Sequence, residues 1–185
     1  MRKFLVLFFS IFLFFSCSKN RDVVENIPST KEEAILIYEE GLILLKKGNY
    51  FDARKKFEKS ESLLPQTQWA AKSALMSSYC MYSMNLYDDA ILNLNRFTKT
   101  YPADKNIDYA NYLIAISYYE QILDEDKDIQ PLILSKNKIE SFLKKYPDTD
   151  YAMDLKFKLD LIINQMAAKE LSIARYYIKN EKWIP

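Results

Sequence analysis

Residues 96–102 read RFTKTYP and residues 141–147 read SFLKKYP, so the ending F-x-x-x-Y-P occurs twice in the chain. Pro65 closes an earlier segment of similar length. Proline cannot continue a helix and commonly follows a helix end. Small residues lie twelve positions before these three prolines and large apolar residues lie eight before them, namely Ala53, Ala90 and Ser135, and Phe57, Leu94 and Ile139. This spacing predicts a repeated pair of helices, in which small positions allow close approach and large positions fill a core.

The pattern resembles the tetratricopeptide repeat, a helix-turn-helix unit whose stacked copies form a superhelix. Small residues also recur at the eighth position of each unit, namely Gly41, Ser78, Ala115 and Ala174. The sequence therefore predicts an all-α fold, a tetratricopeptide-repeat superhelix of about three and a half helix-turn-helix units within residues 29–185. The expected units are residues 34–67, 71–104 and 106–147, with a partial fourth unit at 149–185.

Both ends of the repeat region carry helix signals. Ser29 and Thr30 each precede a glutamate by three positions, which predicts two overlapping capping boxes at the start of the first helix. Residues 150–179 place apolar side chains along one helical face and contain no glycine or proline. This segment predicts a single helix of about 30 residues, roughly 45 Å long.

The composition excludes several classes of protein. The chain has 185 residues, of which 49% are hydrophobic and 28% charged, as expected for one folded domain. It contains no histidine and two glycines, which excludes Ser-His-Asp triads, mixed Cys/His zinc sites and glycine-rich phosphate loops. Its 26 basic and 25 acidic residues give no electrostatic basis for binding nucleic acid. We therefore expect no catalytic residues, no cofactor, no metal and no nucleic-acid partner.

The beginning of the chain has the pattern of a lipoprotein signal peptide. An apolar run at residues 4–15 follows a positively charged start and is too short to span a bilayer. The run ends at Cys17, preceded by serine, which resembles a bacterial lipobox. We expect residues 1–16 to be removed, Cys17 to carry acyl chains that anchor the protein, and residues 17–28 to form a polar tether. Ser18 favours the outer membrane, by resemblance to other lipoproteins.

Two further segments narrow the resemblance. Residues 106–112 read NIDYANY, and residues 172–183 read SIARYYIKNEKW. Both are similar to segments of BamD-type lipoproteins of the outer-membrane β-barrel assembly machinery. The resemblance implies a lipoprotein of the outer membrane that faces the periplasm and binds an Omp85-type central barrel assembly protein and unfolded outer-membrane protein precursors. That family typically carries about five repeats, so we expect a member shortened at the C-terminus, with a partner surface at Tyr176, Tyr177 and Trp183.

The first helices of the units are the expected binding surface. In a repeat of this type the first helix of each unit lines a concave groove. The repeat frame places ten residues there: Tyr38, Leu42, Leu45, Leu75, Tyr79, Tyr82, Tyr109, Tyr112, Ile116 and Tyr119. A wall rich in tyrosine presents flat apolar faces with polar tips, which suits an extended peptide that carries aromatic residues. The alternative for any one of these tyrosines is ordinary packing between helices.

Other functions stay open at this point. A second tetratricopeptide-repeat lipoprotein of the periplasm, such as a secretin pilotin or a coordinator of cell-wall synthesis, would fit the same features. An enzyme is less favoured, because acidic pairs such as Asp88-Asp89 are explained by helix starts, where negative charge offsets the helix dipole. The acidic segment 124–131 is expected to be a solvated loop. Cys80 lies in an apolar stretch and is expected to be a buried, unreactive thiol.

Overall fold

A computed structural model describes residues 29–122 and 129–182. Within these ranges the chain forms seven α-helices and no strand, and the helices are α2 Thr30–Lys46, α3 Tyr50–Leu63, α4 Gln68–Ser83, α5 Tyr87–Thr100, α6 Ile107–Glu120, α7 Gln130–Lys145 and α8 Asp150–Lys179. The predicted all-α repeat fold is confirmed. The expected signal peptide, Cys17, the tether, most of the acidic segment and Trp183 lie outside the described residues.

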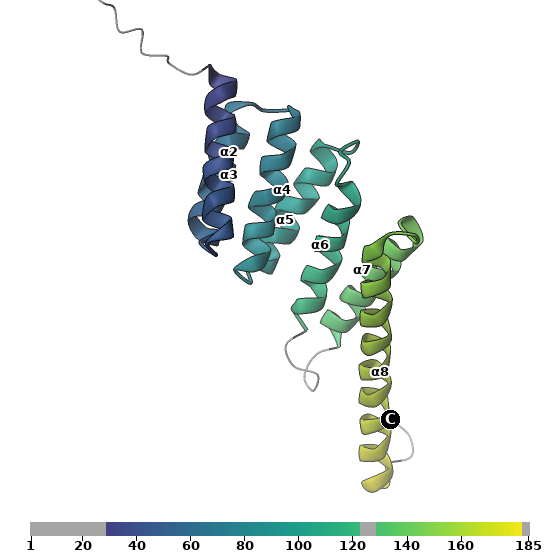
Figure 1. Ribbon diagram of the computed structural model, residues 1–185. Coiled ribbons are helices and arrows are strands. Elements are labelled where there is room, and N and C mark those ends of the chain that lie inside the picture. The colour runs from purple at the N-terminus through teal and green to yellow at the C-terminus, as the bar shows by residue number, and fades with distance from the viewer. Residues whose placement is uncertain (1–28, 123–128, 183–185) are drawn as a thin grey trace, which may run out of the picture.

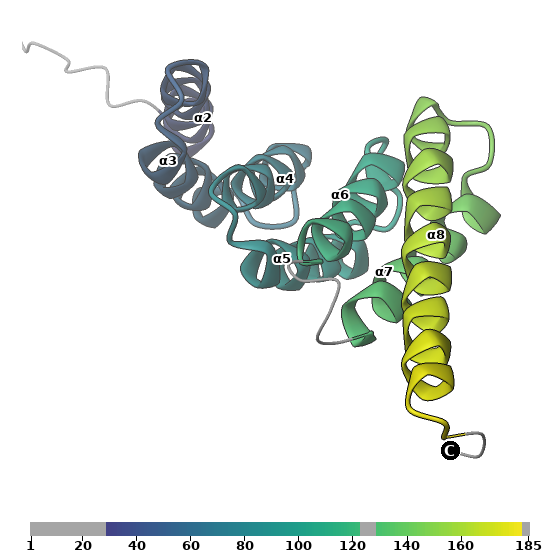
Figure 2. The same cartoon turned by 90° about the horizontal axis from the view of Figure 1, so that it is seen from below.

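Successive helices pair into hairpins that stack along the molecule (Figure 1). α2 packs against α3, α4 against α5 and α6 against α7. The first helices of successive hairpins also touch, because α4 contacts α2, α6 contacts α4 and α8 contacts α6. Figure 2 shows α2, α4 and α6 on one side of the stack and α3, α5 and α7 on the other. α8 crosses the same view lengthwise, so the stack twists toward its end. We call α2, α4, α6 and α8 the first-helix layer.

Local sequence explains where the helices begin and turn. The Ser29 hydroxyl accepts from the Glu32 amide and the Glu32 carboxylate accepts from the Ser29 amide, so one of the two expected capping boxes is present. Gly48 and Asn85 occupy equivalent turns after α2 and α4, with φ of 74° and 59°. Glycine and asparagine tolerate this left-handed conformation best. It lets each hairpin reverse within a few residues.

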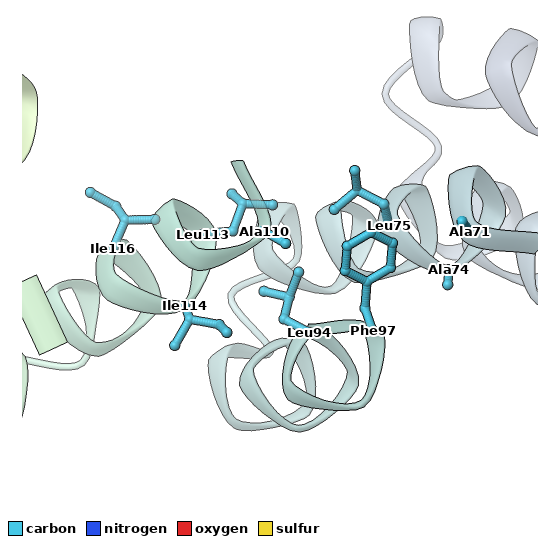
Figure 3. Packing of buried hydrophobic residues seen from close by; sticks show 9 residues of the cluster. All are labelled: Ala71, Ala74, Leu75, Leu94, Phe97, Ala110, Leu113, Ile114 and Ile116. Atoms are coloured by element: carbon cyan, nitrogen blue, oxygen red, sulfur yellow. The ribbon is translucent and has the colours of Figure 1, made fainter. Parts of the chain in front are cut away.

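The hydrophobic core runs between the two layers in three clusters. The middle cluster joins α4, α5 and α6, and Figure 3 shows Phe97 pointing from α5 toward Leu75 on α4. Three of the four small residues at the eighth position of each unit, Gly41, Ser78 and Ala115, are buried, whereas Ala174 is exposed.

Gly41 shows why a small residue is required at this position of the first unit. A Cβ placed on Gly41 would lie 2.8 Å from the ring of Phe57, a residue that is fully buried. Any larger residue would therefore push the Phe57 ring out of a well-packed position.

Buried serines link the first two units. The Ser60 hydroxyl on α3 donates to the Ala34 carbonyl on α2 at 2.8 Å, and the Ser73 hydroxyl on α4 donates to Ser60 Oγ at 3.0 Å. Both serines are fully buried. Because a buried hydroxyl without a partner costs about 1–3 kcal/mol, this chain of hydrogen bonds fixes the register of three helices.

α8 is a single helix of 30 residues, as the sequence predicts. Its first half is held by Ala152, Leu155 and Ile162, which are buried against α6 and α7. Its second half extends beyond the other helices in Figure 1 and exposes Leu171 and Ile178. None of the helices in the described part of the chain has the length and apolar character needed to cross a bilayer.

Candidate functional site

Five tyrosines gather on three neighbouring first helices. Tyr79 and Tyr82 come from α4, Tyr109 and Tyr112 from α6, and Tyr151 from α8. All five are partly buried, so each keeps some of its surface open to solvent. We call these residues the tyrosine cluster. The five side chains lie together for two reasons. Residues three apart on a helix share a face, and the first helices α4, α6 and α8 lie side by side.

Three rings of the cluster, those of Tyr109, Tyr112 and Tyr151, contact one another, and two of these contacts join unit three to unit four. The Tyr112 and Tyr151 rings are stacked with centroids 4.8 Å apart, and the Tyr109 and Tyr151 centroids are 5.5 Å apart. Tyr109 also stacks on Tyr112 at 6.2 Å. Ring pairs at these separations are favourable beyond their buried area. The ring faces of units three and four therefore form one continuous aromatic surface.

One hydroxyl of the cluster is fixed by a charged pair on α8. The Tyr112 hydroxyl donates to Asp154 Oδ2 at 3.0 Å, and Lys158 Nζ donates to Asp154 Oδ1 at 2.6 Å. Lys158 Nζ also lies 5.5 Å from the centroid of the Tyr119 ring. Hydrogen bonds to a charged group are stronger than neutral ones. Asp154 thus fixes the Tyr112 ring while holding Lys158 beside Tyr119.

The surroundings of the cluster disfavour negative charge. Burial is the main cause that raises the pKa of Tyr109 to about 12, followed by the neighbouring tyrosines. Burial also raises the pKa of Tyr82 to about 12, with a further contribution from Glu120. The pKa of Tyr112 is raised by burial and by its hydrogen bond to Asp154. These tyrosines stay neutral at physiological pH and act as hydrogen-bonding, apolar contact surfaces.

The residues expected from the first unit lie apart from the cluster. Tyr38, Leu42 and Leu45 are partly buried against the core cluster of Ala53 and Phe57. The Tyr38 ring is 5.3 Å from Phe57 and 5.6 Å from Trp69 on α4. Their contacts are those of residues that pack between helices.

Two expected groove residues are corrected by the structure. Leu75 is 5% exposed and Ile116 is 3% exposed, and both belong to the middle core cluster. They lie on the same helices as the tyrosines, but their shorter side chains are covered by neighbours. The prediction that they line a groove is wrong, because a ligand would find almost no surface there.

The structure adds three residues on α8 that the repeat frame did not place at the site. Tyr151, Asp154 and Lys158 contact Tyr112 or Tyr119 on α6. Their i, i+3 and i+7 spacing in the sequence puts them on one helical face. Only the packing of α8 on α6 shows which face meets the tyrosines.

The expected partner surface lies in the second half of α8. Tyr176 is 57% exposed and its ring meets Tyr177 edge-on at 5.8 Å. Leu171 and Ile178 are also exposed nearby on the helix. Large apolar side chains with this exposure are typical of a surface that binds another protein when they are contiguous.

Two further features of the described residues are metal-binding potential and the single described cysteine. In residues 29–122 and 129–182 no group of acidic or cysteine side chains is arranged to hold a metal ion. Cys80 is fully buried, and burial raises its pKa to about 12, which keeps it as an unreactive thiol. The arrangement is suited to binding through aromatic faces and hydroxyl groups.

Comparison with known families identifies the chain. The model of the YfiO family, described as an outer membrane lipoprotein, matches residues 30–185. The chain belongs to the YfiO family. The match extends over all seven helices of the described residues, and the resemblance to BamD-type lipoproteins is confirmed. Membership supports an association of this YfiO chain with the outer membrane.

Curated relatives of this YfiO chain are named outer membrane protein assembly factor BamD. The relative from Caulobacter vibrioides is 37% identical over 145 residues, which cover 78% of this chain and 48% of the relative. The relative from Rickettsia prowazekii is 37% identical, and the match covers 78% of this chain and 58% of the relative. The relative from Vibrio cholerae is 25% identical over 93% of this chain and 73% of the relative. The chain spans about half the length of the first two relatives.

Proposed function

We propose that this YfiO-family chain binds partner proteins and unfolded barrel precursors during the assembly of β-barrel proteins into the outer membrane. It does so facing the periplasm and anchored through acyl chains on Cys17. The observation that carries the proposal is the tyrosine cluster on the first-helix layer, in a chain whose relatives are named for outer membrane protein assembly.

The cluster has the properties that an extended aromatic segment requires. Tyrosine offers a large, rigid ring at low conformational cost together with a hydroxyl that bonds to a peptide backbone. Strands of membrane barrels alternate apolar and polar residues and carry aromatic girdles near the membrane surfaces. Such a segment would place its alternate rings along the whole tyrosine cluster, from Tyr79 and Tyr82 to Tyr151, while its backbone meets the hydroxyl groups.

Replacing Tyr79 and Tyr82 by alanine together is expected to weaken peptide binding about tenfold or more, because aromatic residues of this kind dominate binding energies. The probe is a fluorescent peptide with alternating phenylalanine and polar residues, and the measurement is its anisotropy during titration. Tyr118→Ala is the matched control. Tyr118 lies on α6 under Lys138, whose Nζ is 5.3 Å from the centroid of its ring. Equal affinity of the double variant and the wild type would contradict the proposal.

The second half of α8 is the proposed contact with an Omp85-type barrel assembly protein. Leu171 and Ile178 lie seven residues apart on the same helical face, and both are at least half exposed. Changing them to aspartate leaves the buried residues of α8 untouched, so the fold is expected to persist.

We expect wild-type protein purified from membranes in detergent to recover the Omp85-type protein, and the variant Leu171→Asp, Ile178→Asp to recover at least about fivefold less. Leu36→Asp, which changes a leucine of similar exposure on α2, serves as the control. Identification of the recovered protein by mass spectrometry decides between functions. Recovery of a secretin or a cell-wall synthase instead of the barrel protein would reject the proposed function.

A further inference from the structure

Glu120 stands at one end of the tyrosine cluster without a partner. It is the last residue of α6 and is partly buried. Its side chain forms no hydrogen bond and no ion pair with any residue in the described part of the chain. An unpaired carboxylate beside tyrosine rings attracts a cation, so a basic group at this position would be stabilised.

Contacts between helices fix the surroundings of Glu120. The side chain of Gln121, the next residue, donates to Asp88 Oδ1 at 3.1 Å, which holds the end of α6 against the start of α5. The Tyr87 ring on α5 lies 5.8 Å from the Tyr82 ring on α4. The ends of α4 and α6 and the start of α5 therefore meet beside Tyr82.

The charge at this end of the cluster is negative. Lys158 is engaged by Asp154 at 2.6 Å, so that pair is close to neutral. Glu120 and Asp88 have no such ammonium partner among the described residues. Carbonyl groups at the C-termini of α4 and α6 add partial negative charge, while Asp88 offsets the positive N-terminus of α5. The acidic end is thus complementary to a positive group.

We propose that the tyrosine cluster selects segments that carry a basic side chain next to their aromatic residues, and that Glu120 receives the basic group while the Tyr82 ring covers it. This inference rests on the proposed function of the cluster as a peptide-binding surface. The occupant is an extended, unfolded segment in which an arginine or a lysine follows an aromatic position.

Two properties of the surroundings support a cation at this place. Guanidinium and ammonium groups bind over tyrosine faces as well as to carboxylates, and the two attractions act together when water is partly excluded. Glu120 and Asp154 also help to raise the pKa of Tyr82 and so disfavour a further negative charge there. An acidic residue at the same position of a segment would be repelled.

The test uses two peptides that are identical except at one position, where one has arginine and the other has citrulline, its neutral analogue of the same shape. Fluorescence anisotropy gives the affinity of each peptide for the wild type, for Glu120→Gln and for the control Glu39→Gln. Glu39 is an exposed residue on α2, away from the cluster. Glutamine keeps the size of glutamate, and circular dichroism checks that each variant is folded.

We expect the arginine peptide to bind wild type and Glu39→Gln about fivefold more tightly than the citrulline peptide. Glu120→Gln should reduce this preference to less than about twofold and leave the citrulline affinity unchanged. Equal affinities of the two peptides for wild type would overturn the inference while the proposed peptide binding stands. Equal loss of preference in both glutamine variants would also overturn it, because a distant charge would then act as well. Failure of both peptides to bind would reject the proposed function itself.

Discussion

Replacing Phe97 by alanine is expected to lower the free energy of unfolding by about 3–5 kcal/mol, the typical cost of a large cavity in a core. Phe97 is fully buried between α4, α5 and α6, and its ring lies 5.5 Å from that of Tyr101. Urea unfolding followed by circular dichroism measures the change.

Leu92→Ala is the matched control for this prediction, because Leu92 is on the same helix and 72% exposed. We expect it to change stability by less than about 0.5 kcal/mol. In a stacked repeat each unit contacts its neighbours, so the Phe97 variant should lose amide protection first in α4 to α6. A loss of less than about 1 kcal/mol would contradict the packing described here.

Raising the pH from about 10 to about 12 is expected to lower the free energy of unfolding by roughly 3 kcal/mol through three tyrosines. The pKa values of Tyr82 and Tyr109 are raised to about 12, and that of Tyr112 is raised as well. An unfolded tyrosine loses its proton near pH 10. The stability that these tyrosines contribute is therefore fully present below about pH 10. It is lost as the pH rises from there through the pKa values of the folded protein. Partial exposure reduces the effect below the full value of about 1.4 kcal/mol per pH unit and group.

Urea unfolding at several pH values, with tyrosinate absorbance recorded in parallel, measures this dependence. The variant Tyr82→Phe, Tyr109→Phe keeps both rings but removes two ionisable groups, so its stability should fall less steeply above about pH 10. Other groups, such as lysines, titrate equally in both proteins and cancel in the difference. Identical pH dependence of variant and wild type would show that the cluster is open to solvent.

The sequence predicts the fold well because repeat spacing is a local property. Prolines at fixed distances mark where each hairpin ends, and small residues mark where helices approach each other. These positions can be recognised without knowledge of distant contacts. The turn at Asn85, equivalent to that at Gly48, has no strong signal in the sequence. The long helix at 150–179 follows from its unbroken periodicity.

The site is predicted less completely because it forms between units. Leu75 and Tyr79 lie four residues apart on one face of α4, so the repeat frame predicts the same position in the groove for both. In the structure the leucine is covered while the longer tyrosine reaches solvent. Periodicity predicts the direction in which a side chain points, but it does not predict how far neighbouring side chains cover it. For the same reason Asp154 could not be assigned to Tyr112, which is 42 residues away in the chain.

α8 is a single long helix that joins the tyrosine cluster to the exposed residues at its other end. Its packed end carries Tyr151 and Asp154, and its free end carries Tyr176, a distance of roughly 33 Å at 1.5 Å per residue from Asp154. A straight helix turns as one body, so a tilt of about 5° at the packed end would displace the free end by about 3 Å. Any ligand on the tyrosine cluster that tilts α8 would therefore move its far end most, at a place that the ligand itself does not touch.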